Sequence, residues 1–242
     1  MPGDAKAYIS LVSAAGILAM AYAFLNPLWP HDVFQFGTYW ILSLWAATLK
    51  LRLPGLPGTM SIGFVLVLLS AWQLTLAETM FIACCGVAVQ CVWRAKTRPQ
   101  PIQLFFSVSA VAVSLLLSYQ SSLFLRIRFR GEPVSIVLAV TTCLYFMTNS
   151  LLFSGVSSLV KREPLRGIWQ QCYLFAFPYY LLGGAVAGAM AISGKEFGWK
   201  PPLLILPVMG LTYLFYRLYL ARFEMLPVMA SASLQTAESR GD

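Results

Sequence analysis

The chain has 242 residues, of which 59% are hydrophobic and only 11% are charged. A water-soluble domain usually carries about 25% charged residues, so this composition leaves too little polar surface to cover a soluble protein. The mean hydropathy of +0.72 points the same way. The composition therefore excludes a soluble globular domain and predicts an integral membrane protein.

Eight apolar stretches are long enough to cross a bilayer, for which about 17 to 25 residues are needed. Because every backbone N–H and C=O needs a partner within the hydrocarbon, and no alternation typical of barrel strands is present, we expect helices. The third and fourth stretches are divided only by residues 75–78, which predicts a tight hairpin with Glu78 in its exposed turn. The predicted spans are Ala7 to Leu25, Val33 to Leu49, Met60 to Leu76, Ala77 to Trp93, Ile102 to Leu125, Val134 to Val160, Ile168 to Ile192 and Pro202 to Leu220.

These spans predict an all-α polytopic bundle over residues 1–224, followed by a short disordered cytoplasmic tail over residues 225–242. The first span lacks a convincing cleavage site and has only Lys6 in its n-region, so we expect it to be retained rather than removed as a signal peptide. An even number of spans places both termini on the same side of the membrane. Seven spans remain the alternative count, because the third and fourth are hard to separate.

The distribution of Lys and Arg predicts the orientation, since cytoplasmic loops carry an excess of these residues. With eight spans, the side that holds both termini collects most of the 17 basic residues. These are Lys6, Lys50, Arg52, Arg94, Lys96, Arg98, Lys161, Arg162, Arg166, Arg217, Arg222 and Arg240. Both termini are therefore predicted to be cytoplasmic.

One basic cluster, Arg126, Arg128 and Arg130, falls on the opposite side of this prediction. Its alternation with apolar residues is typical of a short amphipathic segment resting on lipid headgroups. A mistaken span count is the alternative explanation. The net charge of +8 is assigned to the cytoplasmic face of the membrane and not to nucleic-acid binding, because no basic run interleaved with aromatic residues stands clear of the membrane.

Ionisable groups suited to catalysis or ion transport are scarce. None of the nine acidic residues lies at the centre of a predicted span, and the single histidine lies in the first loop. An intramembrane carboxylate or histidine would indicate a proton or ion pathway. The cysteines show no metal-ligand spacing. We therefore expect neither a pump nor an enzyme, and no cofactor or metal.

Polar and small residues within the spans are the candidates for a ligand pocket or for helix contacts. Pro178 breaks the hydrogen bonding of the seventh span between aromatic residues, and the spacing of Gly184 and Gly188 allows a neighbouring helix to approach closely. Ordinary packing between helices accounts for the same pattern. The candidates are Gln90, Asn149, Pro178, Tyr179, Tyr180, Gly184 and Gly188.

A Pro- and Gly-rich segment between the second and third spans predicts a turn that folds back into the membrane interface. It reads KLRLPGLPGTMS over residues 50–61, and residues 89–93 (VQCVW), residues 98–101 and residues 177–181 (FPYYL) follow it. In order and spacing these segments resemble the membrane module at the N-terminus of bacterial HD-GYP phosphodiesterases and of related GGDEF or histidine-kinase signalling proteins. The resemblance covers roughly residues 8–224.

This resemblance implies a sensory or anchoring module that passes a membrane signal to a cytoplasmic effector through its last helix. In those proteins the last span continues as a charged helix, whereas here Pro227 interrupts it. No HD pair, GGDEF-like run or phosphoacceptor histidine is found, so the activity of those proteins is not carried over. We expect the chain to act through a separate effector, or to be a remnant of a longer signalling protein.

Three classes of function remain at this point. A sensory or anchoring module would bind the bilayer and an effector in trans, and a second copy of the chain is a further candidate partner. A small-molecule carrier, or a substrate-binding membrane subunit of a transporter, could hold a solute among buried polar groups. A membrane-embedded enzyme fits least. The candidate residues for docking a partner are Arg94, Lys96, Arg98, Lys161, Arg162 and Arg217.

Overall fold

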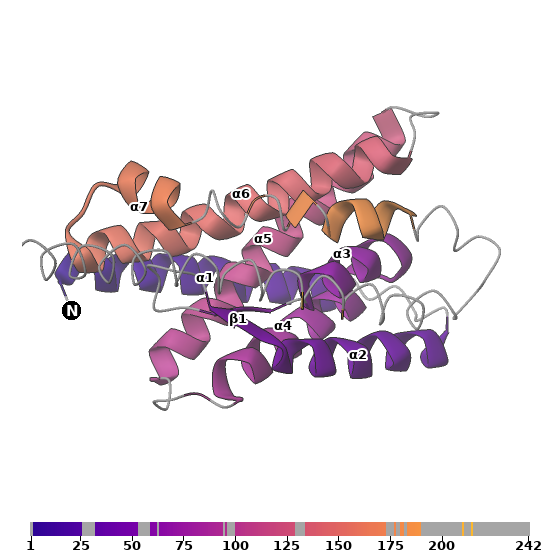
Figure 1. The fold of residues 1–242 in the computed structure, drawn as a ribbon, viewed down its shortest axis with the longest axis horizontal. Coiled ribbons are helices and arrows are strands. Elements are labelled where there is room, and N and C mark those ends of the chain that lie inside the picture. The colour runs from indigo at the N-terminus through magenta and orange to yellow at the C-terminus, as the bar shows by residue number, and fades with distance from the viewer. Residues whose placement is uncertain are drawn as a thin grey trace, which may run out of the picture.

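The protein is described by a computed structural model (Figure 1). The structure describes residues 2–25, 32–52, 59–61, 63–93, 95, 100–128, 134–172, 177, 180, 181, 183–189, 210 and 214. Over these residues the elements are α1 (Gly3–Leu25), α2 (Val33–Thr48), β1 (Lys50–Arg52), β2 (Thr59–Ser61), α3 (Gly63–Gln73), α4 (Leu76–Val92), α5 (Pro101–Arg128), α6 (Val134–Lys161) and α7 (Leu165–Cys172).

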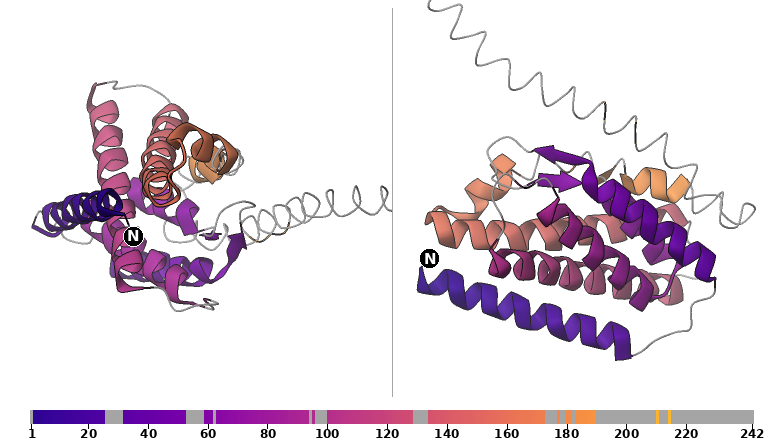
Figure 2. Two further views of the ribbon diagram at one scale, coloured as in Figure 1. Left: turned by 90° about the vertical axis from the view of Figure 1, so that its left-hand side faces the viewer. Right: turned by 90° about the horizontal axis from the view of Figure 1, so that it is seen from below.

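The helices α1 to α6 run in alternating directions along one bundle (Figure 2, right view). Tyr8 in α1 packs against Phe106 in α5 with ring centroids 6.4 Å apart, so the starts of these two helices lie together. Tyr8 also donates a hydrogen bond to the carbonyl of Leu152 near the end of α6, at 3.3 Å. We call the end of the bundle that holds the start of α1 the proximal end, and the opposite end the distal end.

Helix α3 forms the core of the bundle. All its residues from Gly63 to Ala71 are buried, as expected of a helix that is apolar on every side. Its 11 residues extend about 16 Å, well short of the roughly 30 Å of hydrocarbon in a bilayer. The predicted span from Met60 to Leu76 is therefore wrong at its start, because α3 begins only at Gly63 and is enclosed by its neighbours.

Two short strands replace the beginning of that predicted span. Strands β1 and β2 pair antiparallel, with Lys50 opposite Ser61 and Arg52 opposite Thr59. Pairing satisfies backbone groups that a Pro- and Gly-rich segment cannot satisfy by forming a helix. The expected fold-back turn is thus flanked by a two-stranded ladder, and its tip, residues 53–58, lies outside the described residues.

The turn between α3 and α4 is closed by a capping box. The hydroxyl of Thr75 accepts a hydrogen bond from the backbone N–H of Glu78, and Oε2 of Glu78 accepts one from the backbone N–H of Thr75. This arrangement satisfies two of the free donors at a helix start. Glu78 is half-buried in the first turn of α4, so the prediction that an exposed turn carries it was wrong.

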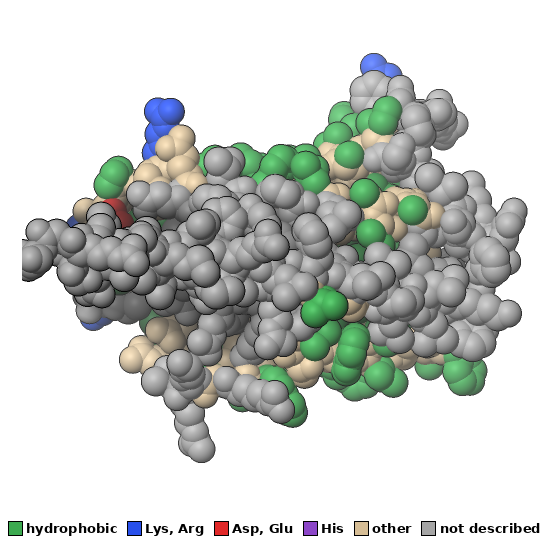
Figure 3. Space-filling view, viewed as in Figure 1, with side chains coloured by type: hydrophobic (Ala, Val, Ile, Leu, Met, Phe, Trp, Pro, Cys, Tyr) green, Lys and Arg blue, Asp and Glu red, His purple; other side chains and the backbone are tan. Residues whose placement is uncertain are grey.

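Within the described residues, three helices are long and apolar enough to cross a membrane, namely those over Gly3–Leu25, Pro101–Arg128 and Ile136–Lys161, and α3 and α4 are shorter apolar helices. Leu11, Leu18 and Leu25 on α1 are 70 to 80% exposed, a pattern suited to contact with lipid. In Figure 3 the visible hydrophobic side chains lie along the upper and lower sides of the view, and the visible Lys and Arg lie towards its left and right ends. The described chain is thus a helical membrane protein, and the eight spans and their orientation stay predictions.

Helix α7 differs from the predicted seventh span. It has eight residues and one apolar side, on which Ile168 is 3% exposed. The indole N–H of Trp169 donates a hydrogen bond to Oγ of Ser150 in α6, at 3.0 Å. Helix α7 therefore folds back onto α6 at the proximal end, and the described helical residues 183–189 lie apart from it in Figure 1. Most of the predicted eighth span and the whole of the predicted tail lie outside the described residues.

Candidate functional site

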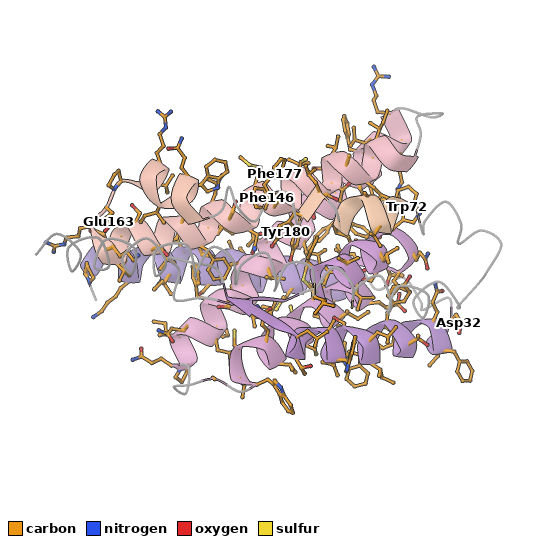
Figure 4. All side chains as sticks on the ribbon, in the orientation of Figure 1. Asp32, Trp72, Phe146, Glu163, Phe177 and Tyr180 are labelled. Atoms are coloured by element: carbon orange, nitrogen blue, oxygen red, sulfur yellow. The ribbon has the colours of Figure 1, made fainter. Side chains whose placement is uncertain are left out.

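An aromatic cluster joins the chain around Tyr180 to α3 and α6, and we refer to it as the aromatic cluster throughout. The ring of Tyr180 lies 4.3 Å from that of Phe64 in α3 and 4.9 Å from that of Phe146 in α6, measured between centroids. Phe146 also contacts Phe177 at 5.2 Å, and Tyr145 lies 6.4 Å from Tyr180. Figure 4 shows Phe146, Phe177 and Tyr180 together in the middle of the bundle.

The α6 half of this site follows from helical spacing. Leu138, Thr142, Tyr145, Phe146 and Asn149 recur at intervals of three or four residues, which places them on one side of a helix. All of them are buried except Asn149, which is half-buried. The hydroxyl of Thr142 donates to the carbonyl of Leu138 at 2.7 Å, so this polar group does not demand a partner from another helix.

The two glycines predicted at a helix contact behave differently. A Cβ atom built on Gly184 would lie 2.6 Å from Oγ1 of Thr142, a distance that real side chains do not tolerate. At Gly188 the nearest atom would be Cδ1 of Leu138 at 3.9 Å, which is an ordinary contact. The close approach expected from their four-residue spacing is therefore present at Gly184, while Gly188 has room for a methyl group.

A third glycine, Gly183, makes a tighter contact, with helix α3, which the four-residue spacing of Gly184 and Gly188 did not predict. A Cβ atom there would overlap the ring of Phe64 and come 2.8 Å from Cγ2 of Val65. The adjacent pair Gly183 and Gly184 thus faces α3 on one side and α6 on the other. Because small residues let helix backbones approach closely in a membrane, this pair determines how the segment around Tyr180 packs against α3 and α6.

Asn149 supplies the polar group of the site. Its side chain lies close enough to Tyr180 to act on that hydroxyl, while its Oδ1 atom is buried and has no hydrogen-bond partner. A buried carbonyl oxygen without a donor is unfavourable. Asn149 and Tyr180, both predicted from the sequence, are therefore brought together, and one acceptor remains available between α6 and the Tyr180 segment.

The other pocket candidates are not placed in this site. Gln90 is half-buried near the end of α4, a helix that packs mainly against α2 and α5. Pro178 and Tyr179 lie outside the described residues, although Phe177 and Tyr180 on either side of them are described.

The docking candidates that the structure describes lie in the loop between α6 and α7. Lys161 and Arg162 are exposed, together with Arg166 at the start of α7. Arg162 has a φ angle of 57°, and Oγ of Ser158 donates to the carbonyl of Glu163 at 2.6 Å, which closes the end of α6. Figure 4 shows Glu163 at the proximal end. The four remaining candidates, Arg94, Lys96, Arg98 and Arg217, lie outside the described residues.

The distal end carries a polar network whose side chains were not predicted from the sequence to lie together. Oε1 of Gln73 accepts hydrogen bonds from Nε2 of Gln35 at 2.8 Å and from the hydroxyl of Tyr39 at 2.9 Å. Nearby the guanidinium of Arg126 lies over the ring of Trp72, 3.4 Å from its centroid. Arg126 is half-buried and Arg128 is exposed, and the expectation that this cluster rests on lipid headgroups stays a prediction. In the sequence, the only indication of this network was a glutamine and an arginine near the ends of predicted spans.

The described part of the site offers polar groups that can bind a ligand and helix contacts that can shift, but it shows no arrangement of residues for covalent chemistry. Its polar groups are amides, hydroxyls and an indole, none of which is an activated nucleophile beside a base. Within the described ranges no group of three or more His, Cys, Asp or Glu residues could hold a metal ion.

Comparison with protein families gives one match, the family MASE9, whose model aligns with residues 11–182. The match covers more than half of the chain and includes the larger part of α1, all of α2 to α7 and the aromatic cluster. Comparisons with curated proteins and with solved structures found no similar chain.

Proposed function

The chain belongs to the MASE9 family of membrane-associated sensory domains, and from this premise we propose that it is a multi-pass sensor of the bacterial inner membrane which controls a cytoplasmic effector on a separate chain. The effector is of the signalling type that the sequence resemblance suggests, a second-messenger enzyme or a kinase. The sensor itself is not catalytic in this proposal.

The observation that supports it best is the course of α6 through the bundle. This 28-residue helix carries Tyr145, Phe146 and Asn149 of the aromatic cluster in its middle. At its proximal end it leads directly into the exposed basic loop at Lys161 and Arg162. A shift of the Tyr180 segment against α6 would therefore be transmitted to this loop through one continuous helix, because packed interfaces tend to move between discrete arrangements.

The arrangement of α6 and α7 supports docking at the proximal end. The loop exposes Lys161, Arg162 and Arg166 within six residues, and the hydrogen bond from Trp169 to Ser150 holds α7 beside it. A rigid basic surface attracts an acidic partner surface and speeds its association. The excess of Lys and Arg in the loops of this end supports a cytoplasmic location.

Site-specific photocrosslinking in the native bacterium tests the proposal. A photoreactive amino acid at exposed Lys161 or Leu165 should capture a second-messenger enzyme or a kinase, identified by mass spectrometry. The matched control places the same amino acid at Phe34, which is 86% exposed at the distal end and should capture lipid only.

Charge reversal sharpens this experiment. The double substitution Lys161→Glu and Arg166→Glu should abolish capture from position 165, whereas Lys6→Glu, which reverses an exposed charge of the same end on α1, should leave it unchanged. Capture of lipid alone from both ends would contradict the sensor proposal. Capture of a transport ATPase at Leu165 would favour the carrier alternative.

Topology is tested independently by reporter fusions after Asp32, Lys96, Glu132, Glu163, Glu196 and Glu224. Their signals should alternate, beginning outside and ending inside. A periplasmic signal at Glu163 would place the basic loop outside the cell and would exclude cytoplasmic docking there.

A further inference from the structure

The distal end holds a guanidinium that the protein itself leaves unpaired. Arg126 belongs to the last turn of α5, and its Nε and Nη2 atoms are buried and have no hydrogen-bond partner. Its flat face is occupied by the ring of Trp72. A buried charged group without a hydrogen-bond partner is costly, so this arrangement is one that a ligand would complete.

The two unpaired nitrogens form one edge of the guanidinium. Nε and the adjacent Nη atom carry parallel N–H bonds, which is the geometry that binds two oxygens of a phosphate or carboxylate at once. Stacking on an aromatic ring leaves this edge available, because the ring covers the face and not the rim. The guanidinium of Arg126 is thus positioned to bind two oxygens of one oxyanion rather than a single acceptor atom.

No described side chain supplies that oxyanion. Glu78 is one acidic candidate, because it and Arg126 both lie near Tyr119. Oε2 of Glu78, however, accepts from the backbone N–H and the hydroxyl of Thr75 at 2.9 and 2.8 Å, and its Oε1 is also without a partner. Glu78 therefore belongs to the capping box of α4 and does not pair with the edge of Arg126.

A phosphodiester presents two oxygens that share one negative charge, which matches the single charge and the two parallel N–H bonds of this edge. We propose that the Nε and Nη2 edge of Arg126, above the ring of Trp72, is a binding site for the phosphodiester group of a phospholipid headgroup or of a soluble phosphodiester. The site goes beyond the proposed function, because it does not depend on any effector.

The position within the bundle suits a lipid headgroup. Arg126 and Trp72 lie at the ends of α5 and α3, and Figure 4 shows Trp72 at the distal end near Asp32. Arginine and tryptophan are typical of the level at which headgroups meet hydrocarbon. The edge is closed to solvent in this structure, so binding requires the atoms covering it to move.

Native mass spectrometry of the full chain in maltoside micelles, which contain no phosphate, provides the test. Added phosphatidylglycerol should form a one-to-one complex with the wild type. Arg126→Lys keeps the charge but loses the two-pronged edge, and it should bind about tenfold more weakly. Arg128→Lys is the matched control, because Arg128 is exposed two residues further along the same helix, and its binding should not change.

Competition with glycerophosphoglycerol, the same headgroup without acyl chains, distinguishes the two sources. Displacement of the lipid at millimolar competitor indicates a site for soluble phosphodiesters, and no displacement indicates a lipid site. Equal weakening by Arg126→Lys and Arg128→Lys would overturn the proposal, as would a wild type that binds no phosphatidylglycerol. Should Arg126→Lys fail to fold, Trp72→Phe replaces it and should weaken binding relative to Arg128→Lys. Unchanged binding by Trp72→Phe would overturn the proposal.

Discussion

The middle and the distal end of this bundle are held together by different interactions. In the middle, Gly183 lies close against the ring of Phe64 and Gly184 lies close against the side chain of Thr142. At the distal end, Gln73 joins Gln35 to Tyr39 through hydrogen bonds, and Arg126 lies on Trp72. The middle should therefore respond to changes of volume, and the distal end to the loss of polar partners.

The largest effect is expected from adding one methyl group in the middle. Gly183→Ala and Gly184→Ala should each lower the free energy of unfolding by about 1–3 kcal/mol, because the new atom has no room and the helices must shift. Gly188→Ala is the control, and it should be neutral or stabilising, since alanine favours the helix by up to about 1 kcal/mol. Unfolding by denaturant in detergent measures all three. Equal stability of Gly184→Ala and Gly188→Ala would show that the middle of the bundle does not respond to added volume at Gly184.

Removing the shared acceptor at the distal end should cost nearly as much. Gln73→Leu leaves the hydroxyl of Tyr39, a fully buried side chain, without a partner, so we expect a loss of about 1–3 kcal/mol. Combining it with Tyr39→Phe removes both partners and should restore part of that loss. A double-mutant cycle measures the coupling. If the effects of the two substitutions on the free energy of unfolding simply add, the hydrogen bond between Gln73 and Tyr39 does not contribute to stability.

The cap of α4 should contribute less. Thr75→Ala removes the hydroxyl that accepts from the N–H of Glu78, and loss of such a cap typically costs about 1 kcal/mol. Thr75→Ser keeps the hydroxyl and should retain most of the stability. Thermal unfolding of both variants gives the comparison. Equal melting temperatures for Thr75→Ala and the wild type would mean that the cap is not important for α4.

The smallest effect on stability is expected at Asn149. Its Oδ1 atom has no partner, and hydrogen bonds between helices in membranes average only about 0.6 kcal/mol. Asn149→Leu should thus change the free energy of unfolding by less than Gln73→Leu does, while it alters the response of the effector in cells. Normal regulation in a stable Asn149→Leu variant would exclude Asn149 from signal transmission.

Several elements could be predicted from local sequence alone. Hydropathy placed α1, α2, α5 and α6 to within a few residues, because a long apolar run must be helical inside a membrane. It failed for α3, where the predicted start at Met60 belongs to strand β2. At the seventh span the structure adds that helix α7 begins at Leu165 and packs against α6, and the span itself stays a prediction. Averages along the chain cannot detect such tertiary contacts.

Composition and the order of motifs, which are properties of the chain alone, predicted a helical membrane protein that resembles a signalling module, and the match to the MASE9 family supports a membrane-associated sensory domain. Three contacts depend on the tertiary structure: Gly184 and not Gly188 lies against a neighbour, Asn149 lies close to Tyr180, and Arg126 lies over Trp72. Residue spacing fixes which side chains share a face of a helix. The rotation and depth of each helix in the bundle, which packing against its neighbours sets, decide what that face meets.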